Sequence, residues 1–496
     1  TNNNIYLLTG GFIYVTNNAT LTIQPGTLIK GDASSLVITR GAKIMAQGTA
    51  EHPIVFTSAY DAGQRAAGDW GGVLILGKAP VNDPAGQRLG EGGIDPTLGW
   101  YGGTDPHDNS GVIQYCRIEF AGVAYVPNSE TNGLTLGGVG DGTIIDHVQV
   151  SFGGDDSFEF FGGTVNVKYL VTYRSLDDEF DTDYGYSGHL QFCVSLRDSS
   201  LADVSGSNGF ESDNDANGSS NTPTTRPIIS NFTIVGPKRT LGTTVHSNYK
   251  RGAHLRRGTS ECIYNSLIMG YPTGLQVENT STFDNCTNDL LQWRNNIIAG
   301  CPAAMDNLTA TNLTTWYNDG GNSTLANVSD LMLANPYHWT APDFQPQQGS
   351  PALTGADFSA TNLQKSFFTQ TAYRGAFDGT HDWTAGWTNW DPENTPYLTV
   401  PITGVQPSLV ATIGSLGIHP NPSSSGVTLS LDLVRSDLVE ITLVNPAGQV
   451  VMHESLRLHA GSNQVALNVS GLNQGMYLAQ VKASDGNHAL RLAVMH

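Results

Sequence analysis

The sequence has few charged side chains, and only a minority of these are basic. Charged residues make up 14% of the 496 residues, against about 25% in an average soluble domain. The 24 Lys and Arg are outnumbered by 44 Asp and Glu, which gives a formal net charge of −20. Such an excess repels phosphate backbones and anionic membrane surfaces, so we do not expect a nucleic-acid partner.

Long apolar runs and long helical periods are also missing. No run of about 18 apolar residues occurs, which excludes a predicted membrane-spanning helix. The sequence instead has 57 Gly residues and many short β-branched runs between turns, which predicts an all-β protein. It opens at "TNNNIYLLTGG" without Met or a signal peptide, and we interpret this as the mature form of an exported, extracellular or cell-surface protein.

Cysteine is scarce, and its spacing matches no zinc site. An odd number of cysteines in an exported protein leaves at least one unpaired. Two interpretations stay open: a bridge from Cys286 to Cys262 or Cys301, or five small buried hydrophobic residues. The cysteines are Cys116, Cys193, Cys262, Cys286 and Cys301.

One short phrase recurs along most of the chain. It consists of a polar or Asn position, alternating apolar residues and then Gly. It appears as "IQYCRIEFAG" (113–122), "IDHVQVSFGG" (145–154), "ISNFTIVG" (229–236), "IYNSLIMG" (263–270) and "RNNIIAG" (294–300). An offset of 22 residues relates "DDSFE" (155–159) to "DDEFD" (177–181). Strands repeating at this interval without helical crossovers predict a parallel β-helix, in which equivalent residues of successive coils stack about 4.8 Å apart.

The opening segments resemble a known class of β-helix proteins. "LTIQPGTLIKG" (21–31), "AKIMAQGTAEHPIVFTS" (42–58) and "GDWGGVLILGKAPVN" (68–82) are similar to the first coils of secreted right-handed parallel β-helix proteins of Bacteroidetes type. The resemblance implies the fold but no single function, because this fold hosts lyases, hydrolases, adhesins and scaffolds. We predict a β-helix over residues 1–400, with residues 341–400 closing its C-terminal end.

The character of the sequence changes after residue 400. Residues 401–415 form a Pro-bearing linker, and residues 416–496 alternate apolar and polar positions, which predicts a small Ig-like antiparallel β-sandwich. The phrases "LGIHPNPSSSGVTLSLDL", "VEITLVNPAGQVV" and "LNQGMYLAQV" resemble the sorting domain of the type IX secretion system. The resemblance implies secretion machinery of the outer membrane as a partner. A sorting domain that stays on the chain also suggests self-association into filaments.

Two acidic clusters would stack if 22 residues make one coil. Asp155 then lies next to Asp177, Asp156 next to Asp178, and Glu159 next to Asp181. Like charges at about 4.8 Å repel by roughly 1 kcal/mol in water and by more in a lower dielectric. Bound Ca²⁺, which takes six to eight oxygen ligands, would remove that repulsion. A solvated acidic face or raised carboxyl pKa values are the alternatives.

A second candidate for calcium is "DNDANG" (213–218). Asp213, Asp215 and Asn217 have the spacing that opens an EF-hand loop. The loop's last ligand position is Thr224 rather than Glu, and an Asx-rich turn explains the same residues without a metal.

A faint resemblance to pectate lyases supplies the one catalytic hypothesis. "IDHVQVSFGGDDSFEF" (145–160) is similar to their I-D-H phrase followed by acidic calcium ligands, and "RGAHLR" (251–256) has the arginine spacing of their R-x-P-x-x-R motif. The resemblance implies Arg251 or Arg256 as the base. The motif departs from the family at Ala253, in place of Pro, and at Ile144, in place of Trp. Arginines that offset nearby carboxylates are the competing interpretation.

Three tryptophans near residue 390 suggest either a binding platform or a hydrophobic plug. Trp383, Trp387 and Trp390 lie close together in the sequence, and aromatic rings stack on sugars. The sequence as a whole therefore favours a non-catalytic, structural or adhesive surface protein that carries Ca²⁺. A calcium-dependent polysaccharide lyase or a glycan-binding protein is the alternative.

Overall fold

The structure is a computed structural model of the chain. It describes residues 1–126, 129–307, 313–397, 413–433, 437–445, 449–483 and 486–495. The chain divides into two compact units, Thr1–Leu398 and Thr399–His496. Most of the predicted linker, residues 401–412, lies outside the described residues.

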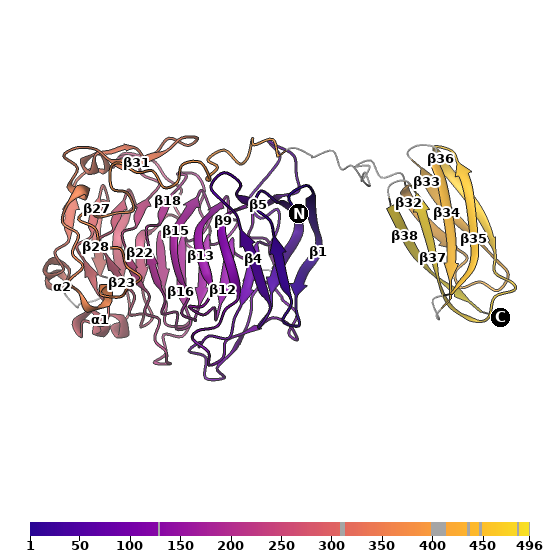
Figure 1. Cartoon of the computed structure of the whole chain (residues 1–496), viewed down its shortest axis with the longest axis horizontal. Coiled ribbons are helices and arrows are strands. Elements are labelled where there is room, and N and C mark those ends of the chain that lie inside the picture. Colours follow the sequence, from indigo (N-terminus) through magenta and orange to yellow (C-terminus); the bar gives the residue numbers. More distant parts are fainter. Residues whose placement is uncertain are drawn as a thin grey trace. The chain divides into compact units, whose positions relative to one another are not determined.

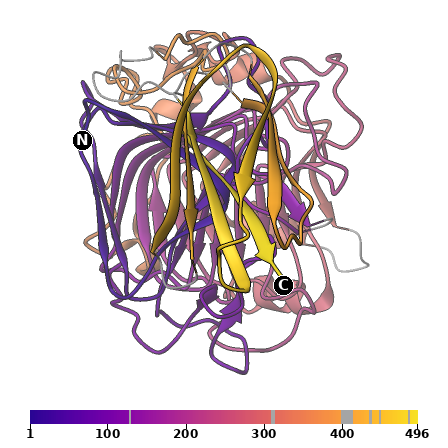
Figure 2. The same cartoon turned by 90° about the vertical axis from the view of Figure 1, so that its right-hand side faces the viewer.

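The first unit is a parallel β-helix, as the repeat predicts. Each short strand pairs in parallel with the equivalent strand of the next coil. Figure 1 shows the successive coils stacked in a row, and Figure 2 views the same row from its end. Phe158 pairs with Phe180, 22 residues on, which confirms the predicted stacking of the acidic clusters. The interval is not constant, because loops lengthen some coils: Phe180 pairs with Phe210 and Phe210 with Ala253.

Strand pairing divides the coils into three faces. The strap face holds β5 (Ile54–Ser58), β18 (Val194–Leu196), β21 (Thr233–Val235), β24 (Leu267–Met269), β27 (Ile297–Ala299) and β29 (Ser323–Leu325). The ladder face holds β6 (Val73–Leu76), β12 (Leu134–Gly137), β14 (Phe158–Phe161), β16 (Phe180–Asp183), β19 (Phe210–Ser212), β22 (Arg251–Leu255), β25 (Thr273–Val277) and β28 (Ala303–Asn307). The third face holds β2 (Thr20–Ile23), β4 (Lys43–Gln47), β17 (His189–Gln191), β20 (Ile228–Ser230), β23 (Cys262–Tyr264) and β26 (Trp293–Arg294).

Five longer strands turn a corner and belong to two faces. β1 (Ile5–Val15) and β3 (Leu28–Ile38) join the strap and ladder faces, and β9 (Gly111–Glu119), β13 (Ile144–Ser151) and β15 (Asn166–Tyr173) join the third and strap faces. The Asn of the recurring phrase occupies a corner: Asn231, Asn265 and Asn295 have φ of 59°, 51° and 56°. Asn tolerates this left-handed conformation better than most residues, which explains its recurrence.

The remaining elements of the unit are short and lie outside the coils. Two hairpins pair β7 (Arg88–Leu89) with β8 (Trp100–Tyr101) and β10 (Ala124–Val126) with β11 (Ser129–Glu130). Two α-helices, α1 (Thr280–Thr287) and α2 (Thr314–Asp319), follow late coils, and three 3₁₀ turns cover Val328–Leu331, Pro351–Leu353 and Thr361–Leu363. β30 (Leu333–Asn335) pairs with β31 (Asp343–Pro346).

Residues 333–397 form a strap along the solenoid, and this corrects the predicted closure of its C-terminal end by residues 341–400. Figure 1 shows the segment after β31 returning along the row of coils. Side-chain amides of successive coils hold its backbone. Asn265 bonds Asp357 and Gln191 bonds Thr369, each through one donated and one accepted hydrogen bond. The strap buries apolar residues that point outward from the strap face, such as Val194 and Met269.

The interior of the coils is apolar, and Cys116 and Cys193 belong to it. Phe158, Phe180 and Phe210 stack on one another with ring centroids 5.7 and 5.8 Å apart. All five cysteines are free, four of them buried and Cys301 half-buried. The predicted bridge from Cys286 to Cys262 or Cys301 is therefore wrong, and the alternative of small hydrophobic residues holds.

The second unit is a sandwich of two antiparallel sheets. One sheet has the order β32 (Ile413–His419), β33 (Gly426–Leu433), β36 (Gly461–Asn468). The other has the order β35 (Val450–Leu458), β34 (Asp437–Val444), β37 (Gly475–Ala483), β38 (Gly486–Val494). Strict alternation puts Leu429, Ile441 and Ala479 in the shared core, as the sequence pattern predicts. Among the described residues of the chain, no helix combines the length and the apolar character needed to span a membrane.

Candidate functional site

A repeated dipeptide builds the site on the ladder face. Phe158-Glu159, Phe180-Asp181 and Phe210-Glu211 occupy equivalent positions of β14, β16 and β19. Side chains alternate along a strand, so the three Phe rings enter the core while the three acids point outward. Parallel pairing then places Glu159 beside Asp181, and Asp181 beside Glu211.

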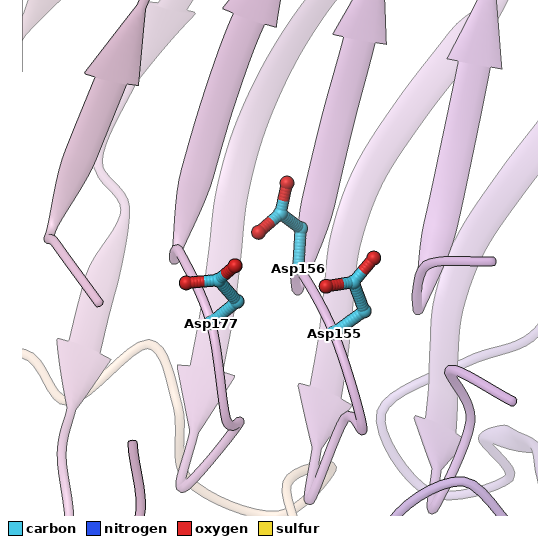
Figure 3. A group of neighbouring side chains, drawn as sticks. All are labelled: Asp155, Asp156 and Asp177. Atoms are coloured by element: carbon cyan, nitrogen blue, oxygen red, sulfur yellow. The ribbon is translucent and has the colours of Figure 1, made fainter. Parts of the chain in front are cut away.

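The turns that precede β14 and β16 add four more carboxylates. Asp155 and Asp156 come before β14, and Asp177 and Asp178 occupy the same positions one coil later. Figure 3 shows Asp155 and Asp177 on neighbouring coils, with the carboxyl group of Asp156 between them.

Seven carboxylates form a continuous series, which we call the acid ladder. Its members fall into three groups whose oxygens lie within 4.8 Å of one another. Asp156 belongs to the first two groups and Asp181 to the last two, so the groups are linked. They are Asp155, Asp156 and Asp177; Asp156, Glu159 and Asp181; and Asp178, Asp181 and Glu211.

Hydrogen bonds fix several of these carboxylates. Asp156 accepts the backbone N–H of Asp178 at 2.8 Å, and Asp177 accepts the hydroxyl of Ser205 at 2.5 Å. Glu159 accepts a close hydrogen bond from the side-chain amide of Asn132. The amide of Asn208 donates to Asp178 and to Glu211, at 3.4 and 3.0 Å.

Several buried oxygens in and beside the acid ladder have no donor within the described part of the chain. They include one carboxylate oxygen each of Asp177 and Asp181. The side-chain carbonyl oxygens of Asn132 and Asn208 also accept no hydrogen bond from the described residues. These two residues are only 1% and 0% exposed, so bulk water does not satisfy the oxygens. A buried acceptor without a donor costs free energy, so an electropositive ligand would stabilise this region.

Six of the seven acids, all except Glu211, form no ion pair with the described residues. Among the described residues, no Lys, Arg or His forms an ion pair with the predicted set of Asp155, Asp156, Glu159, Asp177, Asp178 and Asp181. The seventh, Glu211, pairs closely with Arg256. Arg197 and Arg256 offset part of this negative charge without a direct ion pair, since Arg197 acts to lower the pKa of Asp177 and Asp178, and Arg256 that of Asp178.

Burial and mutual repulsion raise the pKa of the acid ladder's carboxyl groups. Burial is the larger cause for Asp177, whose pKa rises to about 7, and Asp178 adds to it. The pKa of Glu211 also rises to about 7, from burial opposed by Arg256. Burial, followed by neighbouring carboxylates, puts the pKa of Asp156 and Asp181 well above the usual value.

This donor set suits a hard divalent cation. All seven side chains offer oxygen only, and Ca²⁺ takes six to eight oxygens in irregular geometry. Within each of the three groups, the oxygens lie close enough together to bind one ion. Softer metals prefer sulfur or imidazole ligands, and none of the three groups contains Cys or His.

The predicted calcium loop at residues 213–218 has a different role. Asp213 forms ion pairs with Arg256 and Arg257 at 2.8 and 2.6 Å, so cationic side chains already occupy its oxygens. Asp215 accepts the backbone N–H groups of Asn217 and Ser219 at 2.9 and 3.1 Å, as in an Asx turn. The prediction that Asp213, Asp215 and Asn217 bind a metal is corrected accordingly.

The two predicted arginines differ in their surroundings. Arg256 forms ion pairs with Glu211 and Asp213. Burial alone would lower the pKa of Arg256, but the combined attraction of these two acids is larger and raises it. A cation held in this way cannot accept a proton, which corrects the assignment of Arg256 as a base. Arg251 donates a hydrogen bond to Gln276 and forms no ion pair with the described residues, and burial lowers its pKa.

His254 follows Glu211 in the same outward column of the ladder face. The imidazole is 3% exposed and lies 2.8 Å from Glu278 and 3.4 Å from Glu211. Burial, together with the charges of Arg251 and Arg256, lowers its pKa to about 4. His254 is therefore neutral at neutral pH and adds no positive charge to the acid ladder.

The three tryptophans hold the strap against the solenoid. Trp387 is 1% exposed, and its indole N–H donates to the carbonyl of Trp383 at 2.8 Å. Trp383 stacks on Phe377 with ring centroids 5.3 Å apart, and Trp390 meets the edge of Tyr173 at 5.1 Å. Trp387 is buried and offers no face to a sugar, whereas Trp383 and Trp390 are half-buried, so glycan binding by these two rings stays a prediction. The predicted plug over an open end is corrected to an anchor on the strap face.

Sequence reasoning missed Glu211 as a member of the acid ladder. The interval from Asp181 to Glu211 is longer than 22 residues, because the loop before β19 is longer. The repeated Phe-acid dipeptide would have identified it independently of the interval.

Two protein-family models match the chain. One, described as a pectate-lyase-like β-helix domain, matches residues 1–344. The other, described as a secretion system C-terminal sorting domain, matches residues 417–495. No curated protein matches the chain.

Two solved structures of one phage protein are similar over the whole chain. The enzymatically active domain of tailspike protein 2 from bacteriophage CBA120 is 10% identical, with 100% of this chain and 72% of that chain covered and a TM-score of 0.18. Full-length tailspike protein 2 from Escherichia coli O157:H7 bacteriophage CAB120 is also 10% identical, with coverage of 100% and 65% and a TM-score of 0.17. Likenesses at these TM-scores carry no argument about function.

Proposed function

The chain belongs to the pectate-lyase-like β-helix family and ends in a type IX sorting domain that directs it to the cell surface or extracellular space, and from this premise we propose that it is a calcium-binding surface protein. The acid ladder is the proposed calcium site. The proposed role is structural or adhesive.

The acid ladder itself carries the proposal. Six linked carboxylates without an ion pair, together with four buried oxygens without a donor, describe a negatively charged site with open coordination positions. Protonation relieves the repulsion only at a cost, because a carboxyl group is normally ionised at neutral pH. Bound Ca²⁺ relieves it without protonation.

Partial exposure of the acid ladder supports an adhesive role. Asp155, Asp177 and Asp181 are half-buried, whereas Asp156 and Asp178 are 7% and 4% exposed. An ion held by the buried members can therefore still take oxygen ligands from outside. Hydroxyl and carboxylate groups of an acidic polysaccharide are ligands of this kind.

Calorimetric titration of the full chain with Ca²⁺ tests the proposed site. We expect saturable binding that is lost in Asp181→Asn, since Asp181 belongs to two of the three oxygen groups. Asp61→Asn is the matched control, because Asp61 is an exposed acid outside the acid ladder. Equal binding by the two variants would contradict the proposal.

Affinity electrophoresis through polygalacturonate gels tests the adhesive role. Retardation should appear with Ca²⁺, disappear with a chelator and be weak in Asp181→Asn. A mobility that is the same in all three conditions would exclude adhesion to this class of polysaccharide.

A calcium-dependent polysaccharide lyase is the second candidate, and the state of Arg251 favours it. Its lowered pKa, due to burial, is the direction that a general base requires. Incubation with polygalacturonate and Ca²⁺ decides between the two roles. A surface protein gives no rise in the ultraviolet absorbance of unsaturated sugars, whereas a lyase gives a rise that Arg251→Ala abolishes.

Filament formation through the sorting domain remains a prediction from the sequence. Negative-stain images of the full chain test it. Images of a chain that ends at residue 400, examined alongside, would show whether residues 417–495 are needed.

A further inference from the structure

A buried ion pair lies beside the turns that carry the acid ladder. Arg197 follows β18, Glu179 precedes β16, and both side chains are 0% exposed. Nε of Arg197 lies 2.8 Å from a carboxylate oxygen of Glu179. Taking two charges out of water costs several kcal/mol per ion, and well-packed apolar residues of similar volume are often at least as stabilising. Stability alone therefore does not explain this pair.

Arg197 holds the turns of two successive coils. Its guanidinium donates to the backbone carbonyls of Ser175, at 2.6 Å, and Asn208, at 3.0 Å. It also donates a close hydrogen bond to the backbone carbonyl of Asp177. The backbone N–H of Asn208 in turn donates closely to the carboxylate of Asp178. One planar cation thus joins the turn before β16 to the turn before β19.

Glu179 extends these contacts to a third coil. Its other carboxylate oxygen accepts the hydroxyl of Ser157 at 3.3 Å, and the hydroxyls of Ser157 and Ser175 form a hydrogen bond of 2.8 Å. Ser157 directly follows Asp156, which belongs to two of the three oxygen groups. The ion pair is therefore linked to three successive turns that carry or contact carboxylates of the acid ladder.

The backbone at Arg197 departs from the pattern of its column. Phe120, Phe152 and Arg174 occupy the equivalent position of the three preceding coils, with φ of 63°, 53° and 56°. Arg197 does not adopt this left-handed conformation. Arg174 is partly exposed and pairs with Asp198, whereas the side chain of Arg197 is fully buried against the turns.

We propose that Arg197, together with Glu179, positions the ligands of the calcium site, an inference that rests on the proposed function. Neither residue is a member of the acid ladder. The three acids within strands follow Phe residues of the core, but the four acids in the turns lie before the strands begin. Their spacing depends on how the turns are held, because the carboxylates repel one another. Residues that orient metal ligands in this way set the affinity of a metal site.

The charge of Arg197 has a separate effect on the site. It acts to lower the pKa of Asp177 and Asp178, and it also repels a bound cation. A substitution that removed the charge would therefore mix electrostatic and positional effects. Arg197→Lys separates them, because lysine keeps the charge but lacks the planar fork that reaches three carbonyls at once.

Calorimetric titration of the full chain with Ca²⁺ tests the proposal. We expect Arg197→Lys to weaken binding by about 10- to 100-fold, as is typical when a residue that orients metal ligands is replaced. Arg65→Lys is the matched control, because Arg65 is 7% exposed and also donates to three backbone carbonyls, but on the strap face. The control should lower the melting temperature and leave the calcium affinity unchanged.

Hydrogen exchange in a chelator measures the positioning without the metal. The backbone N–H of Asp178 donates to Asp156, and that of Asn208 donates to Asp178. Peptides that cover residues 175–178 and 206–209 should lose protection in Arg197→Lys and keep it in Arg65→Lys. Mass spectrometry of both variants and the wild type gives this comparison.

Two results would overturn this inference alone: a folded Arg197→Lys that binds Ca²⁺ as tightly as the wild type, or unchanged protection of the two turns. A wild type that binds no Ca²⁺ would refute the calcium site itself and the inference with it. If Arg197→Lys fails to fold, Ser157→Ala takes its place, since it removes the hydroxyl that links Glu179 to the turn of Asp156. It should weaken binding by about tenfold, and equal binding would overturn the inference.

Discussion

Single residues of the acid ladder are kept close together by the core beneath them. Phe158, Phe180 and Phe210 stack in the interior, and the acid that follows each Phe has no freedom to move away along the strand. Burial of the three rings stabilises the fold, since a buried aromatic side chain contributes about 1.5–3 kcal/mol. The stabilisation from these buried rings therefore offsets the repulsion among the acids.

Asp181→Asn separates the effect of charge from the effect of metal. In calcium-free buffer we expect the variant to be more stable than the wild type by about 1 kcal/mol or more, because one repelling charge is removed. With Ca²⁺ the order should reverse, since the variant lacks a ligand. Chemical denaturation with and without chelator measures both values, and Asp61→Asn should change neither.

The raised pKa values also predict how stability depends on pH. Asp177 and Glu211 have a pKa of about 7 in the folded chain, mainly from burial, above the usual carboxyl value. The folded state then binds more protons than the unfolded state between those values. Stability of the calcium-free protein should fall between about pH 5 and pH 7, by at most about 1.4 kcal/mol per pH unit for each group.

Thermal unfolding in a chelator at pH 5, 6, 7 and 8 measures this dependence. Added Ca²⁺ should raise the melting temperature more at pH 8 than at pH 5, where protons compete for the same oxygens. A melting temperature that rises with pH in the chelator would contradict the assigned pKa directions.

The cysteines give a separate test at the same scale. Thiol titration of the denatured chain without reductant should count five free thiols, and the folded chain should react slowly. Burial raises the pKa of Cys286 to about 12, which keeps this thiol protonated. Fewer than five thiols after denaturation would show a bridge.

At the scale of elements, the strap is the feature that stabilises the solenoid from outside. Arg65 is 7% exposed and donates to the carbonyls of Pro392 and Thr395 at 2.6 and 3.0 Å. Gln149 exchanges two hydrogen bonds of 2.8 Å with Asn389. Segments far apart in the sequence are thereby joined along the strap face.

Trp387→Ala tests whether the tryptophans anchor the strap. Removing a buried Trp should lower the free energy of unfolding by about 3–5 kcal/mol and expose residues 333–397 to limited proteolysis. Val204→Ala, at a 90% exposed position, should be neutral. A variant with unchanged stability but lost retardation in polysaccharide gels would instead support the glycan platform.

The sequence predicts the coils well and the strap poorly, for physical reasons. Strand alternation and the recurring Asn are local signals that reveal the coils. The interval of 22 residues between two coils then predicts that Asp155 lies beside Asp177. The interval fails at Glu211, where a longer loop intervenes. The strap is held by side-chain amides such as Gln191 and Asn265, whose partners are distant in the sequence, and no local pattern reveals such contacts.

At the scale of the whole molecule, the sorting domain indicates export to the cell surface or extracellular space. The proposed calcium site lies on the β-helix. The predicted filament would need a head-to-tail contact that repeats from copy to copy without closing. Sedimentation across a range of concentrations tests for such a contact. A mass that grows with concentration fits a filament, and a constant mass contradicts it.

An anomalous difference map from crystals of the protein grown with Ca²⁺ tests most directly whether the acid ladder binds this ion. We expect peaks within the acid ladder, with oxygen ligands from Asp156 and Asp181 and no peak at residues 213–217. An acid ladder without a peak at saturating Ca²⁺, while its carboxylates keep the spacing described above, would contradict calcium binding at this site.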